Sequence, residues 1–340
     1  MPRHATERAA RLEGSRVAAE QHERLGSSMR ERIPIFDIIE DARIWLLFKP
    51  MQSLYGAYER YHDAAGIIIN AHHPMSLQRF TAAHEYGHHL LGHRASADHE
   101  EQINGGGSQA LQEIAAQAFA GGFLMPVQLV NYTLRTMGVT GQRPDLSARQ
   151  IYQLALELGV SYSAAITVLV GQRKISPAAG RQLRRVSPLA IKTGLAGEKP
   201  EDSWADVWLL DEAQEGREFI ARLRDEIHVT LPETPSSGYA WQVVDQARRV
   251  LALVEDRFEP LGDTEQIGTG GFRHLWFRVT APGAGRIRLE KRRPWQADGQ
   301  ATASFSATLA AIAPLTGDAA HGLPDEQKQG VIDDFRTAAA

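Results

Sequence analysis

The sequence of 340 residues contains no cysteine, so disulfide bridges, thiolate metal ligands and cysteine nucleophiles are excluded. Any metal ion must therefore be held by histidine and carboxylate side chains. An excess of one charge is also lacking, since 37 basic and 41 acidic residues leave a net charge of -4 and no general electrostatic footprint for nucleic acid. No apolar run approaches membrane-spanning length and the charged N-terminus has no signal-peptide core, so we expect a cytoplasmic protein without membrane contact.

The most informative stretch that is present reads His84-Glu85-Tyr86-Gly87-His88. Positions i and i+4 lie on one face of a helix, so His84 and His88 can each offer a ring nitrogen to one metal ion. Glu85 lies beside them and is the candidate general base. The motif favours a zinc-dependent peptidase, although histidine and carboxylate ligands also accept manganese, iron or cobalt.

The residues around this motif predict a strand, a turn and then a helix. Residues 66–70 form an apolar β-branched run, Pro74 marks a turn, and residues 77–91 are helical in composition. In zincins the strand before the active-site helix commonly forms an edge that pairs with an extended substrate. Ile68 and Asn70 are therefore candidate substrate-binding residues.

Zinc needs a third protein ligand, with one position left open. The metzincin pattern would place glycine at 91 and histidine at 94, and it is excluded because the chain has Leu91 and Arg94. His93 follows His84 by nine residues, about half a helical turn out of phase, so it is predicted to face away from the metal. His89 is likewise predicted to point elsewhere.

The next predicted helix, residues 108–124, contains a better candidate in Glu113. Ala116 and Ala120 share the face of Glu113, and such small side chains would let this helix approach the first one closely. A carboxylate could then reach the metal. The spacing alone fits a surface glutamate equally well.

The runs INAHHPMSLQRFTAAHEYGHHLLGH and EIAAQAFAGGFLMP resemble the ImmA/IrrE family of bacterial metallopeptidases, and the resemblance extends roughly over residues 30–185. It implies that zinc is bound by His84, His88 and Glu113. It also implies a regulatory protease that cleaves helix-turn-helix repressors and so releases stress-response or mobile-element genes. The chain departs from the family pattern at Gln117, Gly121 and Gly122, and the two glycines could loosen the second helix by about 1 kcal/mol each.

Residues 154–165 are similar to the helix-turn-helix-like segment of that family. With Gly159 in the turn, and with arginines at 181, 184 and 185, this segment could by itself suggest DNA binding. We favour the alternative, a helical subdomain that packs against the protease core. The net charge does not predict direct nucleic-acid binding.

Length and a change of periodicity predict a multidomain α+β chain. Residues 1–195 are expected to form a zincin-like, mostly helical metallopeptidase domain with a small sheet, and residues 196–216 an acidic linker. Residues 217–314 contain short alternating strands separated by Gly and Pro turns, which predict an antiparallel β-sandwich. Residues 315–340 are expected to form a polar, alanine-rich tail.

Three loops in the predicted sandwich occur in the order and spacing of the binding loops of chagasin-like inhibitors of papain-type cysteine peptidases. They comprise Thr234, Pro235, Ser236, Ser237, Gly238 and Tyr239; Gly268, Gly270 and Gly271; and Arg293, Pro294 and Trp295. The resemblance covers roughly residues 217–313 and implies an immunoglobulin-like sandwich with a wedge of loops at one end. Thr234 replaces the asparagine that usually starts the first loop, a departure that affects its internal hydrogen bonding.

Two functions follow from these observations. The favoured one is a zinc endopeptidase that cleaves a protein substrate, a helix-turn-helix repressor, with the sandwich as a recognition or regulatory module. In the alternative, the sandwich inhibits a papain-type cysteine peptidase and the N-terminal domain is a regulator or scaffold. The presence of His84, Glu85 and His88 argues against an inactive scaffold. Direct control of transcription through residues 154–165 would require specific DNA binding that the charge does not indicate.

Overall fold

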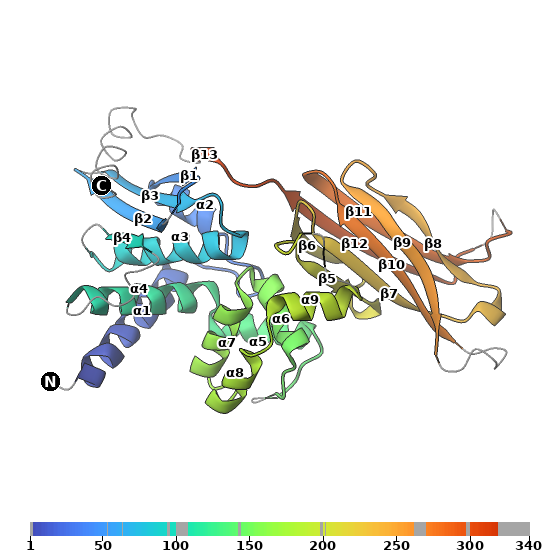
Figure 1. The fold of residues 1–340 in the computed structure, drawn as a ribbon, viewed down its shortest axis with the longest axis horizontal. Helices are drawn as coiled ribbons and strands as arrows, with labels where there is room; N and C mark the ends of the chain where they lie inside the picture. Colours follow the sequence, from blue (N-terminus) through green and yellow to red (C-terminus); the bar gives the residue numbers. More distant parts are fainter. Residues whose placement is uncertain are drawn as a thin grey trace. The chain divides into compact units, whose positions relative to one another are not determined.

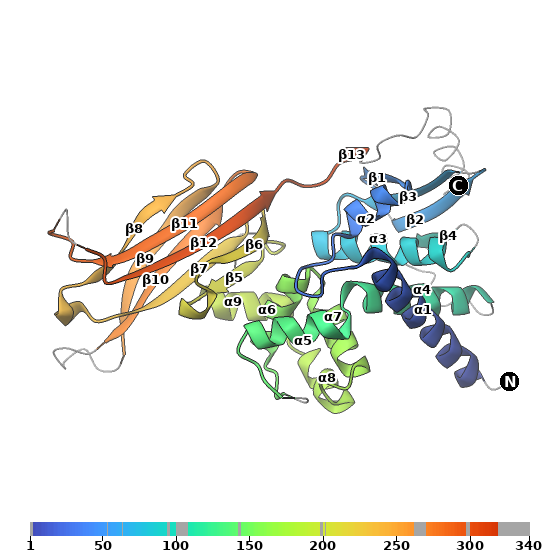
Figure 2. The same cartoon turned by 180° about the vertical axis from the view of Figure 1, so that it is seen from behind.

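The computed structural model describes residues 3–52, 54–62, 64–93, 96–99, 108–141, 144–197, 200, 202–261, 270–296 and 300–318. The chain divides into two compact units (Figures 1 and 2). Unit 1 comprises Met1–Arg185 together with Leu315–Ala340, and unit 2 comprises Val186–Pro314.

The sheet of unit 1 has five strands in the order β13-β1-β3-β2-β4. Their bounds are Trp45–Lys49 for β1, Leu54–Tyr61 for β2, Ala64–Asn70 for β3, Ser96–His99 for β4 and Gly317–Asp318 for β13. β1 and β3 are parallel, and the other pairs are antiparallel. β3 lies in the middle of the sheet and all of its residues are buried, as its β-branched run predicts.

Helices cover this sheet in layers. The helices of unit 1 are α1 (Arg3–Leu25), α2 (Ile35–Asp41), α3 (Met75–Leu90), α4 (Ser108–Leu124), α5 (Val127–Thr136), α6 (Ala148–Leu158), α7 (Tyr162–Gly171) and α8 (Pro177–Leu183). Figure 1 shows α3 between the sheet and α4, and α1 crosses α4. The two helices predicted around the HExxH motif and Glu113 are therefore present, as α3 and α4.

Small residues allow α1 and α4 to pack closely. A Cβ atom added to Gly14 of α1 would lie 2.0 Å from the carbonyl oxygen of Ala115, and one added to Gly122 of α4 would lie 3.6 Å from the Cβ of Ala18. The glycines of α4 were predicted to loosen that helix. Gly122 lies at the crossing with α1, where an added Cβ atom would make only an ordinary van der Waals contact, so the close approach of the two helices depends on Gly14.

We expect Gly14→Ala to lower the free energy of unfolding of unit 1 by about 2 kcal/mol, because the new methyl group would overlap the backbone of Ala115. Gly171→Ala is the matched control, since no atom lies within 4 Å of its added Cβ. Urea unfolding of both variants measures the difference. Equal stability of Gly14→Ala and wild type would contradict the close crossing.

One helical stretch in the described part of the chain, Ala110–Thr136, is long and apolar enough to cross a membrane by length and composition. This differs from the expectation that no run approaches that length. The stretch carries Glu113, and 61% of its most apolar window is buried inside the structure. The core helix of a folded domain passes the same test. α6 and α7, which are bent by 99° relative to each other, also pass it when they are counted together as one span.

Among its described residues, unit 2 contains one α-helix and two sheets of four strands, ordered β5-β7-β10-β9 and β6-β12-β11-β8. The elements are α9 (Pro188–Ala196), β5 (Val207–Leu210), β6 (Arg217–Arg222), β7 (Glu226–Glu233), β8 (Ala240–Gln246), β9 (Leu251–Pro260), β10 (Gly271–Val279), β11 (Gly283–Arg292) and β12 (Ala303–Ile312). Alternate residues of β7 and β12 are buried. The rings of Trp208 in one sheet and Phe219 in the other lie 4.8 Å apart, so apolar side chains from both sheets meet in the core.

The structure differs from three details of the predicted organisation. The sheets are not purely antiparallel, because β5 runs parallel to β7 and β6 runs parallel to β12. The predicted linker, residues 196–216, contains β5 and is therefore part of the folded unit. The predicted tail, residues 315–340, contains β13, which pairs with β1 of unit 1.

Buried polar contacts explain why the acidic segment docks. Asp225, in the turn between β6 and β7, accepts hydrogen bonds from the backbone N–H of Asp206 and from the indole of Trp208, at 2.8 and 3.2 Å. Burial raises the pKa of Asp225 to about 6. Lys192 of α9 pairs with Asp206 at 3.2 Å. Asp206, one of the acidic residues that indicated a linker, thus has partners within the folded unit.

Candidate metal centre

The HExxH motif lies on α3 as its spacing predicts. His84 and His88 are one helical turn apart and both are buried. Their Nε2 atoms face each other at 3.1 Å. Two imidazole nitrogens that face one point from one helical face can serve as ligands of a single ion.

Glu113 of α4 completes the group. Its Oε2 lies 3.1 Å from Nε2 of His84, and its Oε1 lies 3.5 Å from Nε2 of His88. One ligand atom from each of the three residues falls within 4.8 Å of the others. The structure therefore favours the ligand position for Glu113 over a free surface position. A donor set of two imidazoles and a carboxylate fits zinc, with room for a further ligand.

The groups of this cluster shift the pKa values of their neighbours. Burial raises the pKa of Glu113, but hydrogen bonds from His84 and His88 outweigh it and hold the pKa below its ordinary range. The carboxylate is thus ionised at neutral pH and can neutralise part of a cation's charge. Burial and the nearby His88 lower the pKa of His93 to about 4, so His93 is neutral at pH 7.

Glu85, the predicted general base, is fully buried. A Cβ atom added to Gly56 of β2 would lie 3.6 Å from Oε1 of Glu85 and 2.4 Å from the methyl group of Thr81. Gly56 therefore leaves the space in which Glu85 packs between α3 and the sheet. Sequence reasoning did not single out this glycine.

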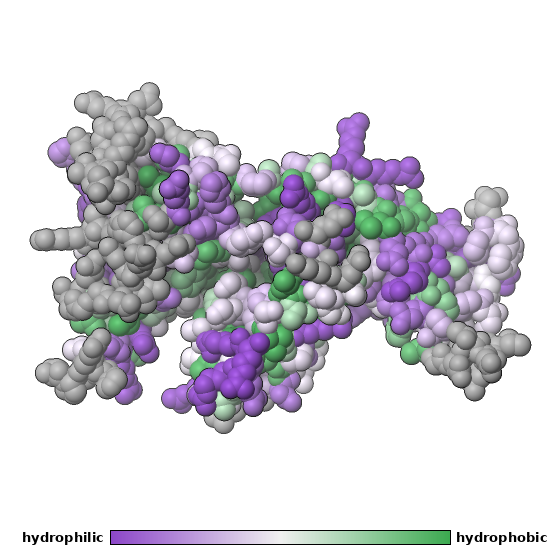
Figure 3. Space-filling view, viewed as in Figure 1, coloured by the Kyte–Doolittle hydropathy of each residue, from purple (hydrophilic) through white to green (hydrophobic). Residues whose placement is uncertain are grey.

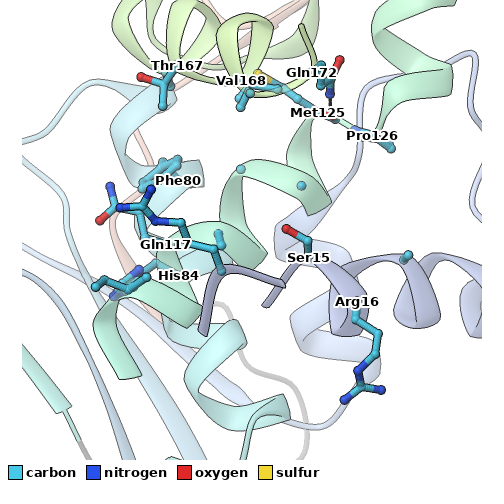
Figure 4. Close-up of a pocket in the computed structure, with 18 of the residues that line it drawn as sticks. Ser15, Arg16, Phe80, His84, Gln117, Met125, Pro126, Thr167, Val168 and Gln172 are labelled. Carbon is cyan, nitrogen blue, oxygen red and sulfur yellow. Dashed lines mark hydrogen bonds between the residues drawn. The ribbon is translucent and has the colours of Figure 1, made fainter. Parts of the chain in front are cut away.

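A pocket in unit 1 opens onto the cluster. His84 and Glu113 line it together with residues of α1, α3, α4 and α7. In Figure 4, Phe80, His84 and Gln117 lie on one side and Thr167 and Val168 of α7 lie across from them. Two members of the cluster, His84 and Glu113, are therefore accessible from this pocket.

The helix-turn-helix-like segment packs against the core of unit 1. At the turn between α6 and α7, the carbonyl oxygen of Gly159 accepts a hydrogen bond from Nε of Arg79 at 3.0 Å. α7 also forms a wall of the pocket. These contacts agree with the favoured subdomain interpretation. The arginines at 181, 184 and 185 are exposed on and after α8, where Figure 3 shows a hydrophilic surface.

The substrate-binding prediction for Ile68 and Asn70 was wrong about the strand. β3 pairs with β1 on one side and with β2 on the other, so its backbone cannot bind an added chain. The side chain of Asn70 donates to the carbonyl oxygens of Met51 and Leu54 at 2.9 and 2.8 Å. Asn70 therefore holds the turn between β1 and β2.

The predicted loops of unit 2 come together at one end of its sheets. The guanidinium of Arg293 lies 4.9 Å from the ring centroid of Tyr239. A Cβ atom on Gly238 would lie 2.9 Å from the ring of Trp295, and one on Gly270 would lie 3.4 Å from Oγ1 of Thr234. The described residues of the three loops therefore lie together on one surface.

The first loop keeps an internal hydrogen bond although Thr234 replaces the usual asparagine. Pro235, Ser236 and Ser237 form a single 3₁₀ turn. The hydroxyl of Ser237 donates to the carbonyl oxygen of Thr234 at 2.6 Å, so the loop has an internal hydrogen bond without an asparagine. In the other loops, Gly271 begins β10, Pro294 precedes Trp295, and Gly268 lies outside the described residues.

Two residues near these sites were missed or misplaced by sequence reasoning. Glu233 is buried, and its Oε2 accepts the backbone N–H of Trp241 at 2.7 Å, which closes the base of the first loop. A charged residue at an inward position of an alternating strand was the available signal. His93 was predicted to face away from the metal, and it lies outside the ligand group, but the contact of its Nδ1 with Nδ1 of His88 at 3.0 Å was missed.

Comparison with known proteins agrees with these two units. Residues 39–168 match the IrrE N-terminal-like domain family, and residues 221–309 match the chagasin family of peptidase inhibitors I42. The radiation response metalloprotease IrrE of Deinococcus deserti is 32% identical over 128 residues, which cover 37% of this chain and 42% of that protein. The chain thus spans less than half the length of that relative. Chagasin of Trypanosoma cruzi is 25% identical over 103 residues, 29% of this chain and 93% of that protein.

Among solved structures, the cysteine protease inhibitor EhICP2 of Entamoeba histolytica is 20% identical, with a TM-score of 0.30, and covers 32% of this chain and 97% of that one. Amebosin is 22% identical, with a TM-score of 0.27, and covers 32% and 98%. By sequence, the chain thus contains a segment similar to the IrrE N-terminal-like domain and, after it, a segment similar to chagasin-family inhibitors.

Proposed function

We propose that unit 1 is a zinc-dependent endopeptidase with a regulatory role. The observation that carries this proposal is the convergence of His84, His88 and Glu113 beside an open pocket. Glu85 directly follows His84 on the same helix. A cluster with no catalytic role would not need a buried carboxylate at that position, because burying an ionisable group is costly.

Metal binding and proton transfer are assigned to different residues of the site. His84, His88 and Glu113 would hold zinc, which supplies a Lewis acid for the peptide carbonyl. Glu85 takes the proton of the attacking water and passes it to the leaving amine. The pocket lined by residues of α1, α3, α4 and α7 receives the substrate chain.

We propose that the substrate is a helix-turn-helix repressor in the cytoplasm. Support comes from the IrrE-like match of unit 1 and from the relative described as a radiation response metalloprotease. Unit 2 would recognise the substrate or receive a signal. In this scheme a single cut changes gene expression without direct DNA binding by this protein.

The test compares newly formed protein N-termini in host cells that express the wild type or Glu85→Gln, with and without stress. A cut in a helix-turn-helix regulator that depends on Glu85 supports the proposal and identifies the substrate. Identical N-termini under all conditions would contradict it.

A second function, inhibition of a papain-type cysteine peptidase, is favoured by the loop surface of unit 2. The side chain of Trp295 there is 69% exposed and packs over Gly238. An exposed aromatic residue beside a stacked Arg293–Tyr239 pair is suited to bury surface against a protein partner.

If the full chain inhibits papain, Trp295→Ala should raise the inhibition constant about 30-fold, because a central aromatic contact contributes about 2 kcal/mol. Trp204→Ala is the matched control, since Trp204 is 61% exposed and lies away from these loops in the sequence. Enzyme assays at several inhibitor concentrations measure both constants. Equal effects of the two substitutions would exclude a specific role for Trp295.

A further inference from the structure

The end of α3 places His93 unexpectedly close to the cluster. The helix ends at Leu90, and Gly92 then adopts a left-handed φ of 67°. The backbone N–H of His93 donates to the carbonyl oxygen of His88 at 3.0 Å, and that of Gly92 donates to His89 at 3.2 Å. This glycine turn reverses the chain, so His93 does not follow the helical phase.

The reversal aligns two imidazole rings. Nδ1 of His93 lies 3.0 Å from Nδ1 of His88, with ring centroids 5.0 Å apart and an interplanar angle of 66°. The other nitrogen of His88, Nε2, faces His84 and Glu113. His93 therefore contacts the side of His88 that is turned away from the cluster.

Two facing Nδ1 atoms at this distance share one proton in a hydrogen bond. The role of the other nitrogen of His88, Nε2, determines which of the two rings carries that proton. When Nε2 of His88 donates its lone pair to a metal, the ring proton must reside on Nδ1. Nδ1 of His93 is then the acceptor, and His93 carries its own proton on Nε2. A partner of this kind fixes both the tautomer and the orientation of a ligand histidine.

We propose that His93 is a positioning residue that accepts a hydrogen bond from Nδ1–H of His88 and so prepares His88 to bind metal. The inference rests on the proposed metal centre of unit 1. His89, one residue after His88, has a different role, because its Nδ1 lies 3.0 Å from the hydroxyl of Tyr58 in β2. His89 therefore provides a control in the same helical turn.

The test measures zinc affinity of the full chain by competition with a chromophoric chelator. We expect His93→Phe to weaken zinc binding by about 10–100-fold, because the ring shape remains but the acceptor is lost. His93→Asn should restore most of the affinity, since its Oδ1 can accept the same hydrogen bond. His89→Phe should bind zinc within about threefold of wild type, because the Nδ1 of His89 faces the hydroxyl of Tyr58 and does not support a ligand.

Wild-type affinity in His93→Phe, or equal weakness in His93→Phe and His93→Asn, would overturn the inference. Absence of zinc binding by the wild type would contradict the proposed metal centre itself. A second measurement needs no variant: ¹H–¹⁵N correlations of the zinc-loaded wild type should show His93 protonated at Nε2 and His88 at Nδ1. Protonation of His93 at Nδ1 would also overturn the inference.

Discussion

Glu85→Gln should lower the rate of peptide cleavage by roughly 10²–10⁴-fold while the protein retains zinc. Glutamine has nearly the size of glutamate, so it fits the fully buried site of Glu85 beside Gly56. It cannot accept a proton from water, and the loss therefore falls on catalysis. Cleavage of the regulator found by the N-terminus comparison, together with zinc content per chain, measures both properties.

Glu31→Gln is the control for this substitution. Glu31 is exposed, and the same chemical change there should leave the rate of cleavage at the wild-type level. Full activity of Glu85→Gln would remove Glu85 from the role of base. Loss of zinc together with activity would assign Glu85 to the support of the metal ligands instead.

Glu113→Ala should weaken zinc binding by at least about 100-fold, because each ligand of a four-ligand zinc site contributes roughly 3 kcal/mol of the total binding free energy. Cleavage should fall with zinc occupancy. The carboxylate lies 3.1 Å from His84 and 3.5 Å from His88, so no other described side chain duplicates its position. Calorimetric or competitive titration with zinc measures the loss.

Gln117→Ala provides the matched control for Glu113→Ala. Gln117 is exposed one helical turn further along α4 and lines the same pocket, but it is outside the ligand group. It should retain wild-type zinc affinity. Wild-type affinity in Glu113→Ala would place the third ligand elsewhere in the chain.

The parts of the site that sequence alone could predict are those set by local geometry. His84 and His88 share a helical face because of their spacing, and that spacing is visible in the sequence. Glu113 needed tertiary information, since only the packing of α4 against α3 brings its carboxylate to the histidines. The residue spacing within α4 fitted a surface glutamate equally well.

The contact of His93 with His88 could not be predicted from helical phase. Helical phase was extended past the end of α3, but the helix stops at Leu90 and Gly92 turns the chain back. The Gly92 signal was present in the sequence, since glycine readily adopts positive φ after a helix. Whether Gly92 would end the helix and reverse the chain could not be decided without the hydrogen bonds that close the turn.

The arrangement of strands was also beyond local reasoning. The run at residues 66–70 correctly predicted a strand, but its place in the middle of the sheet depends on pairing with β1 and β2. The acidic residues before β6 suggested a linker. Contacts of Asp206 with Lys192 and with the turn at Asp225 instead accompany the pairing of β5 with β7. Charge composition does not reveal whether such partners exist.

The most direct test of the proposed peptidase follows zinc and cleavage in one purified preparation of the full chain. The substrate is the regulator identified by the N-terminus comparison, and the metal is removed by a chelator and then returned as zinc. We expect cleavage to disappear when the metal is removed. It should return in proportion to the zinc bound and saturate at one ion per chain. Undiminished cleavage by protein without bound metal would contradict this expectation.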